Sequence, residues 1–241
     1  MKKDITNAMV EDIRAKIAAD PRYGEEGAIV GDALRLYPKN TDSSIIAMKI
    51  ALIDMTNSTQ LSRLLGEKVI TKKNRETGKR EVVSRTKKEI TLGAIIEKIK
   101  MVDFDARVKD GKHDLVSELA QWSQMNGKGV NLFSFFSKYC CYHNELVYGG
   151  DAYSIFDSVI KEYLGDYMSA EEYGEIFGEK LKLRANQTVA SVVCNKIEAM
   201  RTSFDYEHYA TMIDRFLKIK EITCDKKRRK LDLKIWYDNR G

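Results

Sequence analysis

Proline is nearly absent from this chain, and its distribution constrains the fold more than any other feature. Only two of the 241 residues are proline, Pro21 and Pro38, so the 203 residues after Pro38 contain no proline. Because proline breaks helix interiors, and because apolar residues recur at intervals of three and four, we predict an all-α fold of about ten helices. We expect helices at about residues 5–19, 25–36, 43–65, 87–102, 112–125, 131–143, 155–165, 169–181, 186–203 and 205–221.

One segment departs from the helical pattern and concentrates positive charge. Lys68–Ile70 and Glu81–Val83 are short β-prone runs on either side of a Thr77-Gly78 turn. This pattern predicts one small basic β-hairpin or loop insertion near 68–86. The whole chain carries a net charge of only +5, but a second basic run occupies 226–230. Such runs neutralise phosphates or form an ordinary solvated face, and the sequence leaves both interpretations open.

Composition bounds the class of protein. The chain is 43% hydrophobic and 32% charged, values typical of a soluble globular protein. It lacks an apolar run of about 18 residues, so we expect no membrane span, and residues 1–17 resemble an amphipathic helix rather than a signal segment. Four cysteines and three histidines show no metal-ligand or disulfide spacing. We therefore expect no metal site and a cytoplasmic location.

The stretch Asn131–Ser158 carries the candidate chemistry. Apolar residues at helical spacing predict a core-facing helix over 131–143, and Lys138 falls at the edge of its apolar arc. Asp157 follows a Gly- and Asn-containing loop at 144–152, in the first turn of the next predicted helix. Burial lowers the pKa of a lysine, and a neutral amine attacks electrophilic carbon. In the alternative interpretation the lysine extends to solvent and the aspartate only caps its helix.

The same stretch resembles a known family. The run SKYCCYHN at 137–144, a short loop, and YSIFDS at 153–158 resemble the catalytic segment of the helix-hairpin-helix DNA glycosylase superfamily. The similarity is greatest to bacterial proteins with the 8-oxoguanine DNA glycosylase-like fold. In that superfamily a helix carries a lysine nucleophile and an aspartate opens the next helix, positions that match Lys138 and Asp157 here. The Pro-Gly-x-Gly-like hairpin of the family is missing, because the nearest upstream glycines, Gly127 and Gly129, follow no proline.

The resemblance implies an enzyme that removes a damaged or modified base from double-stranded DNA. Such enzymes extrude the target nucleotide into a pocket. Lys138 would attack the sugar C1′ and displace the base, while Asp157 would stabilise positive charge on the sugar. Strand cleavage by an accompanying lyase activity is left open. The resemblance implies no cofactor, and we expect a monomer.

Further residues are assigned to the pocket and to the DNA contact. Trp122 and His143 are alternatively core residues, and Asn57 alternatively caps a kinked helix. The residues expected at the substrate pocket are Asn57, Trp122, Tyr139, Tyr142, His143, Asp151, Tyr153 and Ser158. The residues expected to contact DNA are Lys72, Lys73, Arg75, Lys79, Arg80, Arg85, Lys128, Lys227, Arg228 and Arg229.

Two alternative functions remain open at the level of sequence. One is a nucleic-acid-binding protein with the same fold and no chemistry, which the missing hairpin favours. The other is a phage-defence glycosylase that acts on a modified base. We expect a single domain over residues 1–241, and a division into two lobes, 1–125 and 126–241, with the active-site cleft between them is left open.

Overall fold

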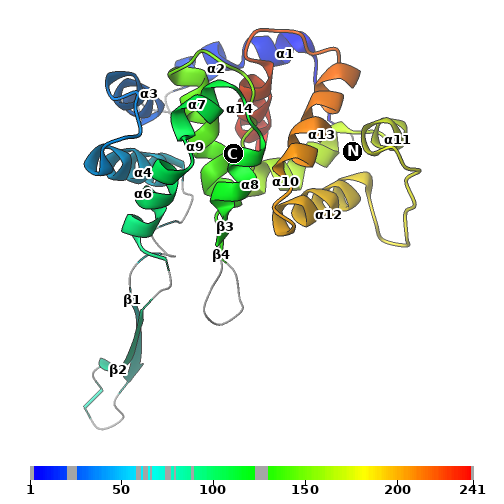
Figure 1. Ribbon diagram of the computed structural model, residues 1–241. Helices are drawn as coiled ribbons and strands as arrows, with labels where there is room; N and C mark the ends of the chain where they lie inside the picture. The colour runs from blue at the N-terminus through cyan, green and yellow to red at the C-terminus, as the bar shows by residue number, and fades with distance from the viewer. Residues whose placement is uncertain are drawn as a thin grey trace.

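The computed structural model describes residues 3–20, 26–57, 67–73, 80–87, 90–122 and 130–239, together with Leu61, Leu65, Thr77 and Gly78. Helices form the body and strands are few (Figure 1), which confirms the predicted all-α class. The helices are α1 (Asn7–Glu11), α2 (Ile13–Ala19), α3 (Glu26–Leu36), α4 (Ser43–Asn57), α6 (Leu92–Met101), α7 (Phe104–Lys109), α8 (Asp114–Ala120), α9 (Phe133–Leu146), α10 (Ser158–Tyr163), the 3-10 helix η1 (Leu164–Tyr167), α11 (Ala170–Phe177), α12 (Val189–Thr202), α13 (Tyr206–Ile219) and α14 (Lys227–Asn239).

Hydroxyl and carboxylate side chains start many of these helices. Thr91 accepts a hydrogen bond from the amide of Ala94 at the start of α6, and Ser169 and Thr188 form capping boxes on α11 and α12. A side-chain oxygen at this position satisfies an amide that the helix itself leaves unpaired. Short-range sequence signals therefore fix where these helices begin.

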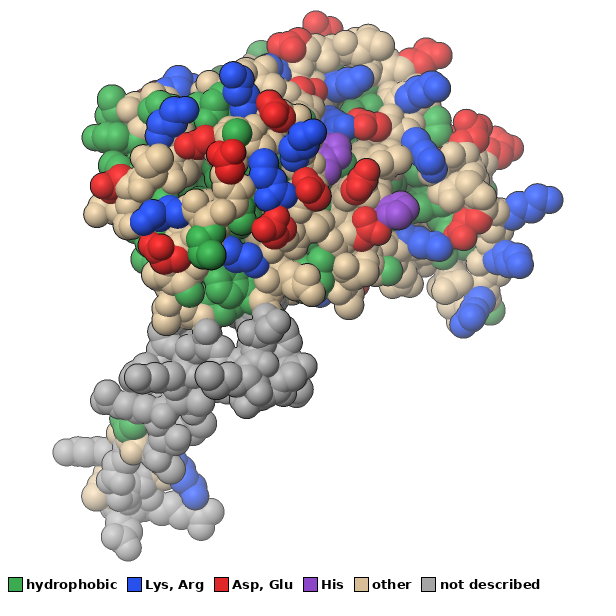
Figure 2. Space-filling view, in the orientation of Figure 1, with side chains coloured by type: hydrophobic (Ala, Val, Ile, Leu, Met, Phe, Trp, Pro, Cys, Tyr) green, Lys and Arg blue, Asp and Glu red, His purple; other side chains and the backbone are tan. Residues whose placement is uncertain are grey.

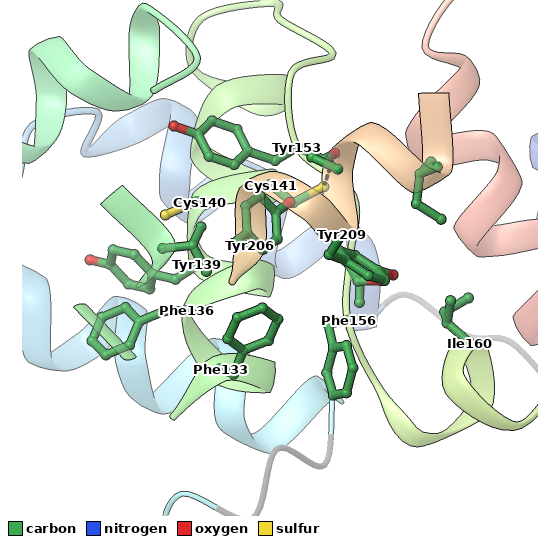
Figure 3. Close-up of a cluster of buried hydrophobic side chains, with 14 of the residues drawn as sticks. Phe133, Phe136, Tyr139, Cys140, Cys141, Tyr153, Phe156, Ile160, Tyr206 and Tyr209 are labelled. Carbon is green, nitrogen blue, oxygen red and sulfur yellow. Dashed lines mark hydrogen bonds between the residues drawn. The ribbon is translucent and has the colours of Figure 1, made fainter. Parts of the chain in front are cut away.

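Helix α9 lies at the centre of the molecule. It contacts α3, α4, α7 and α8, and its residues Phe133, Phe136 and Tyr139 are completely buried. Figure 3 shows these rings in one cluster with Tyr206 and Tyr209 of α13. Phe133 meets the ring of Phe156 edge-to-face with centroids 5.2 Å apart. Buried aromatic rings of this size contribute strongly to the stability of the core.

The two ends of the chain pack together. Helices α1 and α2 both contact α14. The Asn7 side chain accepts hydrogen bonds from the amides of Thr223 and Cys224, at 2.7 and 3.0 Å. The Tyr237 hydroxyl donates to Asp20 Oδ2 at 3.1 Å. The first helices therefore form one packed layer with the last.

A β-hairpin projects from the helical body (Figure 1), which confirms the strand pair predicted near 68–86. Strands β1 (Glu67–Lys73) and β2 (Arg80–Lys87) run antiparallel, with Lys73 opposite Arg80 and Thr71 opposite Val82. The register shifts between Ile70 and Thr71. A second, shorter pair that the sequence did not predict joins β3 (Gln121–Trp122) to β4 (Val130–Asn131).

Three helical segments differ from the prediction. Helix α7 occupies residues between the helices predicted at 87–102 and 112–125, a charged segment in which no helix was expected, because Phe104 and Val108 are one turn apart and both buried. Helix α14 begins inside the basic run at 226–230. Helix α10 begins only at Ser158, three residues later than predicted, because side chains bind the backbone just before it in an extended form.

Candidate active site

Lys138 and Asp157 lie side by side. Lys138 Nζ is 3.7 Å from Asp157 Oδ2, and the two side chains are 5% and 15% exposed. The other carboxylate oxygen of Asp157, Oδ1, accepts the amide hydrogen of Ile160 at 2.9 Å and caps α10. Asp157 therefore holds the helix start with one oxygen and faces the lysine with the other. The capping contact proposed for this residue is therefore present, and the same side chain also lies beside Lys138.

A neighbouring serine joins the two segments that carry this pair. The amide of Phe156 donates to Ser137 Oγ at 2.9 Å, so the residue before Lys138 holds the residue before Asp157. The Ser137 hydroxyl in turn lies 3.0 Å from the carbonyl oxygen of Ser134 and 3.3 Å from that of Phe156. Ser137 is completely buried, so these bonds do not compete with water. The contact fixes α9 against the start of α10.

The segment 152–156 has no regular structure, yet side chains bind its backbone along its length. The hydroxyl of Tyr206 accepts from the amide of Ser154 at 2.9 Å and donates to its carbonyl oxygen at 2.7 Å. Buried backbone groups need such partners, and here helices α9, α13 and α14 supply them. Further contacts are Ala152 N to Asn144 Oδ1, Cys141 Sγ to Tyr153 O, Ile155 N to Asp232 Oδ2 and Tyr209 OH to Ile155 O, and the carbonyl oxygen of Ala152 is bound by Arg228 and lies 2.8 Å from His113 Nε2.

Asp232 is the most unusual member of this group. It is almost completely buried, and burial raises the pKa of its carboxyl well above the ordinary range. Its Oδ2 accepts the amide of Ile155 at 2.7 Å, whereas its Oδ1 has no hydrogen-bond partner in the part of the chain that the structure describes. Sequence reasoning missed Ser137, Tyr206, Tyr209 and Asp232. The sequence signal that could have revealed such a residue is a polar side chain at an apolar position of a predicted helix, as at Ser137.

Three predicted pocket residues belong to the core instead. Tyr139 is completely buried and donates to Asn40 Oδ1 at 2.7 Å, and Tyr153 donates to the carbonyl oxygen of Lys112 at 2.9 Å. His143 is also completely buried, and its ring stacks on Tyr139 with centroids 4.3 Å apart. Burial lowers the pKa of His143 from 6.5 to about 3, so the imidazole is neutral. The core alternative for His143 is confirmed.

The other predicted pocket residues are dispersed. Trp122 donates to the carbonyl oxygen of Leu119, and Lys98 Nζ lies 4.7 Å from its ring centroid. Tyr142 contacts Arg229, and the carboxylate of Asp151 accepts amide hydrogens at the start of α14. Ser158 is exposed in the first turn of α10, directly after Asp157. The side chain of Asn57 lies outside the described residues.

The predicted DNA contacts divide into exposed and buried residues. Lys72, Lys73 and Arg80 are exposed on the hairpin, and Lys227 is half-buried at the start of α14. Arg85 lies on β2, but its side chain is outside the described part, as are residues 75, 79 and 128.

The prediction is wrong for Arg228 and Arg229. Arg228 is 7% exposed, pairs with Asp214 and donates to the carbonyl oxygen of Ala152. Arg229 pairs with Glu145 at 3.6 Å and covers the ring of Tyr142. Both guanidinium groups therefore hold α14 against the body, because the first turn of this helix faces inward.

The described residues contain no group of His, Cys, Asp or Glu side chains suited to a metal ion. In the same part of the chain, every helix is too short or too polar to cross a membrane.

The geometry can be set beside known proteins. The family model HI_0787_N, described as an N-terminal domain, matches residues 8–147, more than half of the chain. The chain belongs to the HI_0787_N family. The match extends from α1 to the end of α9, so it includes Lys138 and ends before Asp157.

An uncharacterized protein of Haemophilus influenzae is 31% identical over 80 residues, which are 33% of this chain and 37% of the relative. The chain thus aligns with little more than a third of that relative's length. No solved structure matches the chain.

Proposed function

We propose that this protein is a DNA glycosylase in which Lys138 is the nucleophile. The observation that supports the proposal most directly is the 3.7 Å approach of Lys138 Nζ to Asp157 Oδ2 at a helix–loop–helix junction. The order, spacing and secondary structure of this pair are those implied by the resemblance to lysine-type DNA glycosylases. The exposed basic hairpin supplies charge that complements a phosphate backbone.

The reaction follows from the two groups. Asp157 Oδ2 takes a proton from Lys138, and the neutral amine attacks C1′ of an extruded nucleotide. The C1′–Nζ bond forms as the glycosidic bond breaks, and the base leaves with the bonding electrons and accepts the proton that Asp157 took from the lysine. The restored carboxylate of Asp157 stabilises positive charge on the sugar and removes a proton from the attached nitrogen. The C1′–O4′ bond then breaks, O4′ accepts that proton from Asp157, and the product is an iminium (Schiff base) that water hydrolyses.

Borohydride trapping tests this proposal. The substrates are duplexes with an abasic site and a panel of duplexes with damaged or phage-modified bases. Wild-type protein should give a covalent adduct after reduction, and Lys138→Ala should give none. Asp157→Asn should release bases far more slowly than wild type while it binds DNA equally well. Lys161→Ala, which changes a lysine on α10 that pairs with Glu198, is the matched control and should retain the adduct.

Burial of the pair makes a folding control necessary. Removing one partner of a buried ion pair costs about 3–5 kcal/mol, so Lys138→Ala has to be compared with the larger Lys138→Met by circular dichroism and thermal unfolding. An adduct that persists in folded Lys138→Met would overturn the proposal. So would a wild-type protein that traps no substrate of the panel.

A non-catalytic role is the second candidate, because Lys138 is only 5% exposed and already faces a carboxylate. In that case the pair would join α9 to α10 and the protein would bind DNA without chemistry. Asp157→Asn separates the two candidates. If the wild-type protein releases no base, and Asp157→Asn loses DNA binding, the result would favour the binding protein.

A further inference from the structure

The connection between α11 and α12 carries three basic side chains that have no place in the site described above. Lys180, Lys182 and Arg184 are exposed, whereas Leu181 between them packs against the core. The segment 180–184 has neither helix nor turn. Three exposed cations are therefore concentrated within five residues of one connection.

The three cations of this segment have little compensating charge beside them in the described chain. The one acidic residue beside it, Glu179, accepts from the Tyr173 hydroxyl at 2.6 Å and pairs with Lys196 at 2.9 Å. The hydrogen bonds of Tyr173 and then of Lys196 lower the pKa of Glu179, and the charges of Lys196 and Lys182 add smaller contributions. In the part of the chain that is described, Lys180, Lys182 and Arg184 form no ion pair. Figure 2 shows Lys and Arg side chains projecting from this edge of the molecule.

Helix α12 links this segment to the candidate active site. Lys161 of α10 pairs with Glu198 at 3.2 Å, and Asn131 donates to the carbonyl oxygen of Arg201 at 2.7 Å. The C-terminal half of α12 is therefore beside the start of α9 and α10, and its N-terminal end leads away to the basic segment. Fourteen residues of helix span about 21 Å, or about six base pairs of duplex.

The basic hairpin lies on the other side of the molecule. In Figure 1 the hairpin extends downward at the left and the α11–α12 connection lies at the right, with α9 and α10 between them. We propose that Lys180, Lys182 and Arg184 bind the backbone of double-stranded DNA on one side of the target nucleotide, while the hairpin binds it on the other. This inference rests on the proposed function. The added contact would take the place of the Pro-Gly-x-Gly-like turn that the glycosylase family uses and this chain lacks.

The salt dependence of duplex binding tests the inference. Each phosphate neutralised by a protein cation contributes about 0.9 to the slope of log affinity against log salt. The triple variant Lys180→Gln, Lys182→Gln, Arg184→Gln should therefore bind an abasic-site duplex more weakly, with a slope shallower by about 2–3. The control changes three exposed lysines on α2, α7 and α13, Lys16→Gln, Lys109→Gln and Lys218→Gln, and should keep the wild-type slope.

The measurement separates this inference from the proposed function. It records binding alone, so a wild-type protein that binds duplex but never traps a substrate would contradict the glycosylase and leave the contact standing. An unchanged slope in the 180/182/184 variant overturns the contact, as does an equal loss of slope in the control. A loss seen with single-stranded DNA but not with duplex also overturns it.

Discussion

His143 shows how one buried ring links stability to pH. Burial lowers its pKa from 6.5 to about 3, so the folded protein excludes a proton that the unfolded chain binds. Stability from this group is complete above pH 6.5 and falls as the pH decreases toward 3, by about 1.4 kcal/mol per unit. His143→Phe, which keeps a ring beside Tyr139, should flatten this part of the free energy of unfolding, measured by urea titration from pH 4 to 7.

The control for this prediction is His208→Phe. The His208 side chain is 75% exposed, so the variant should retain the wild-type slope. Parallel pH profiles for wild type and His143→Phe would show that the imidazole accepts its proton in the folded state.

Residue identity alone could not reveal which basic side chains reach solvent. Five basic residues in a row predict a solvated surface, but Arg228 meets Asp214 and Ala152, which are distant in sequence. Such partners become neighbours only when α14 packs against the body. The Lys138–Asp157 approach was easier to anticipate, because a short loop between two helices restricts how far apart their facing ends can lie.

The segment before α10 positions the side chain of Asp157. Ser137→Ala would leave the buried amide of Phe156 without its partner at 2.9 Å. An unpaired buried amide costs about 1–3 kcal/mol, so the midpoint of urea unfolding should decrease. Because the same bond positions Asp157, the yield of trapped adduct per folded molecule should also fall.

Ser134→Ala is the matched control for this test, since it makes the same change one turn earlier on α9. The Ser134 side chain is half-buried and makes no hydrogen bond within the described chain. Its stability and its adduct yield should match wild type. A folded Ser137→Ala protein with undiminished yield would show that other contacts are sufficient to position Asp157.

Periodicity predicted most helices and failed where tertiary contacts override it. Helix α13 was expected from its apolar spacing and is present at Tyr206–Ile219. Ile155 and Phe156 continue the apolar spacing of α10 toward the N-terminus. Hydrogen bonds from side chains of α9, α13 and α14 nevertheless keep their backbone out of the helix. Helix α7 could have been predicted from Phe104 and Val108, yet its charged residues resembled a loop. Sequence patterns record local preferences, and here long-range hydrogen bonds decide the outcome.

The first and last helices of the chain pack against each other. Helix α14 contacts α1, α2, α10 and α13, and Asp232 of α14 binds the segment before Asp157. The last helix thus connects the first helices to the candidate site. If these contacts bind the chain into one cooperative unit, weakening α14 should loosen distant helices as much as near ones.

Leu231→Ala tests that cooperativity. Leu231 is completely buried in α14, so the truncation should cost about 2–5 kcal/mol, whereas Leu36→Ala, at a side chain that is 69% exposed, should change stability by less than about 0.5 kcal/mol. In native-state hydrogen exchange the slowest amides of α2 and of α9 should accelerate by the same factor in Leu231→Ala. Faster exchange in α2 with unchanged exchange in α9 would mean that the chain unfolds in two parts, and the site would then depend on α14 only through Asp232.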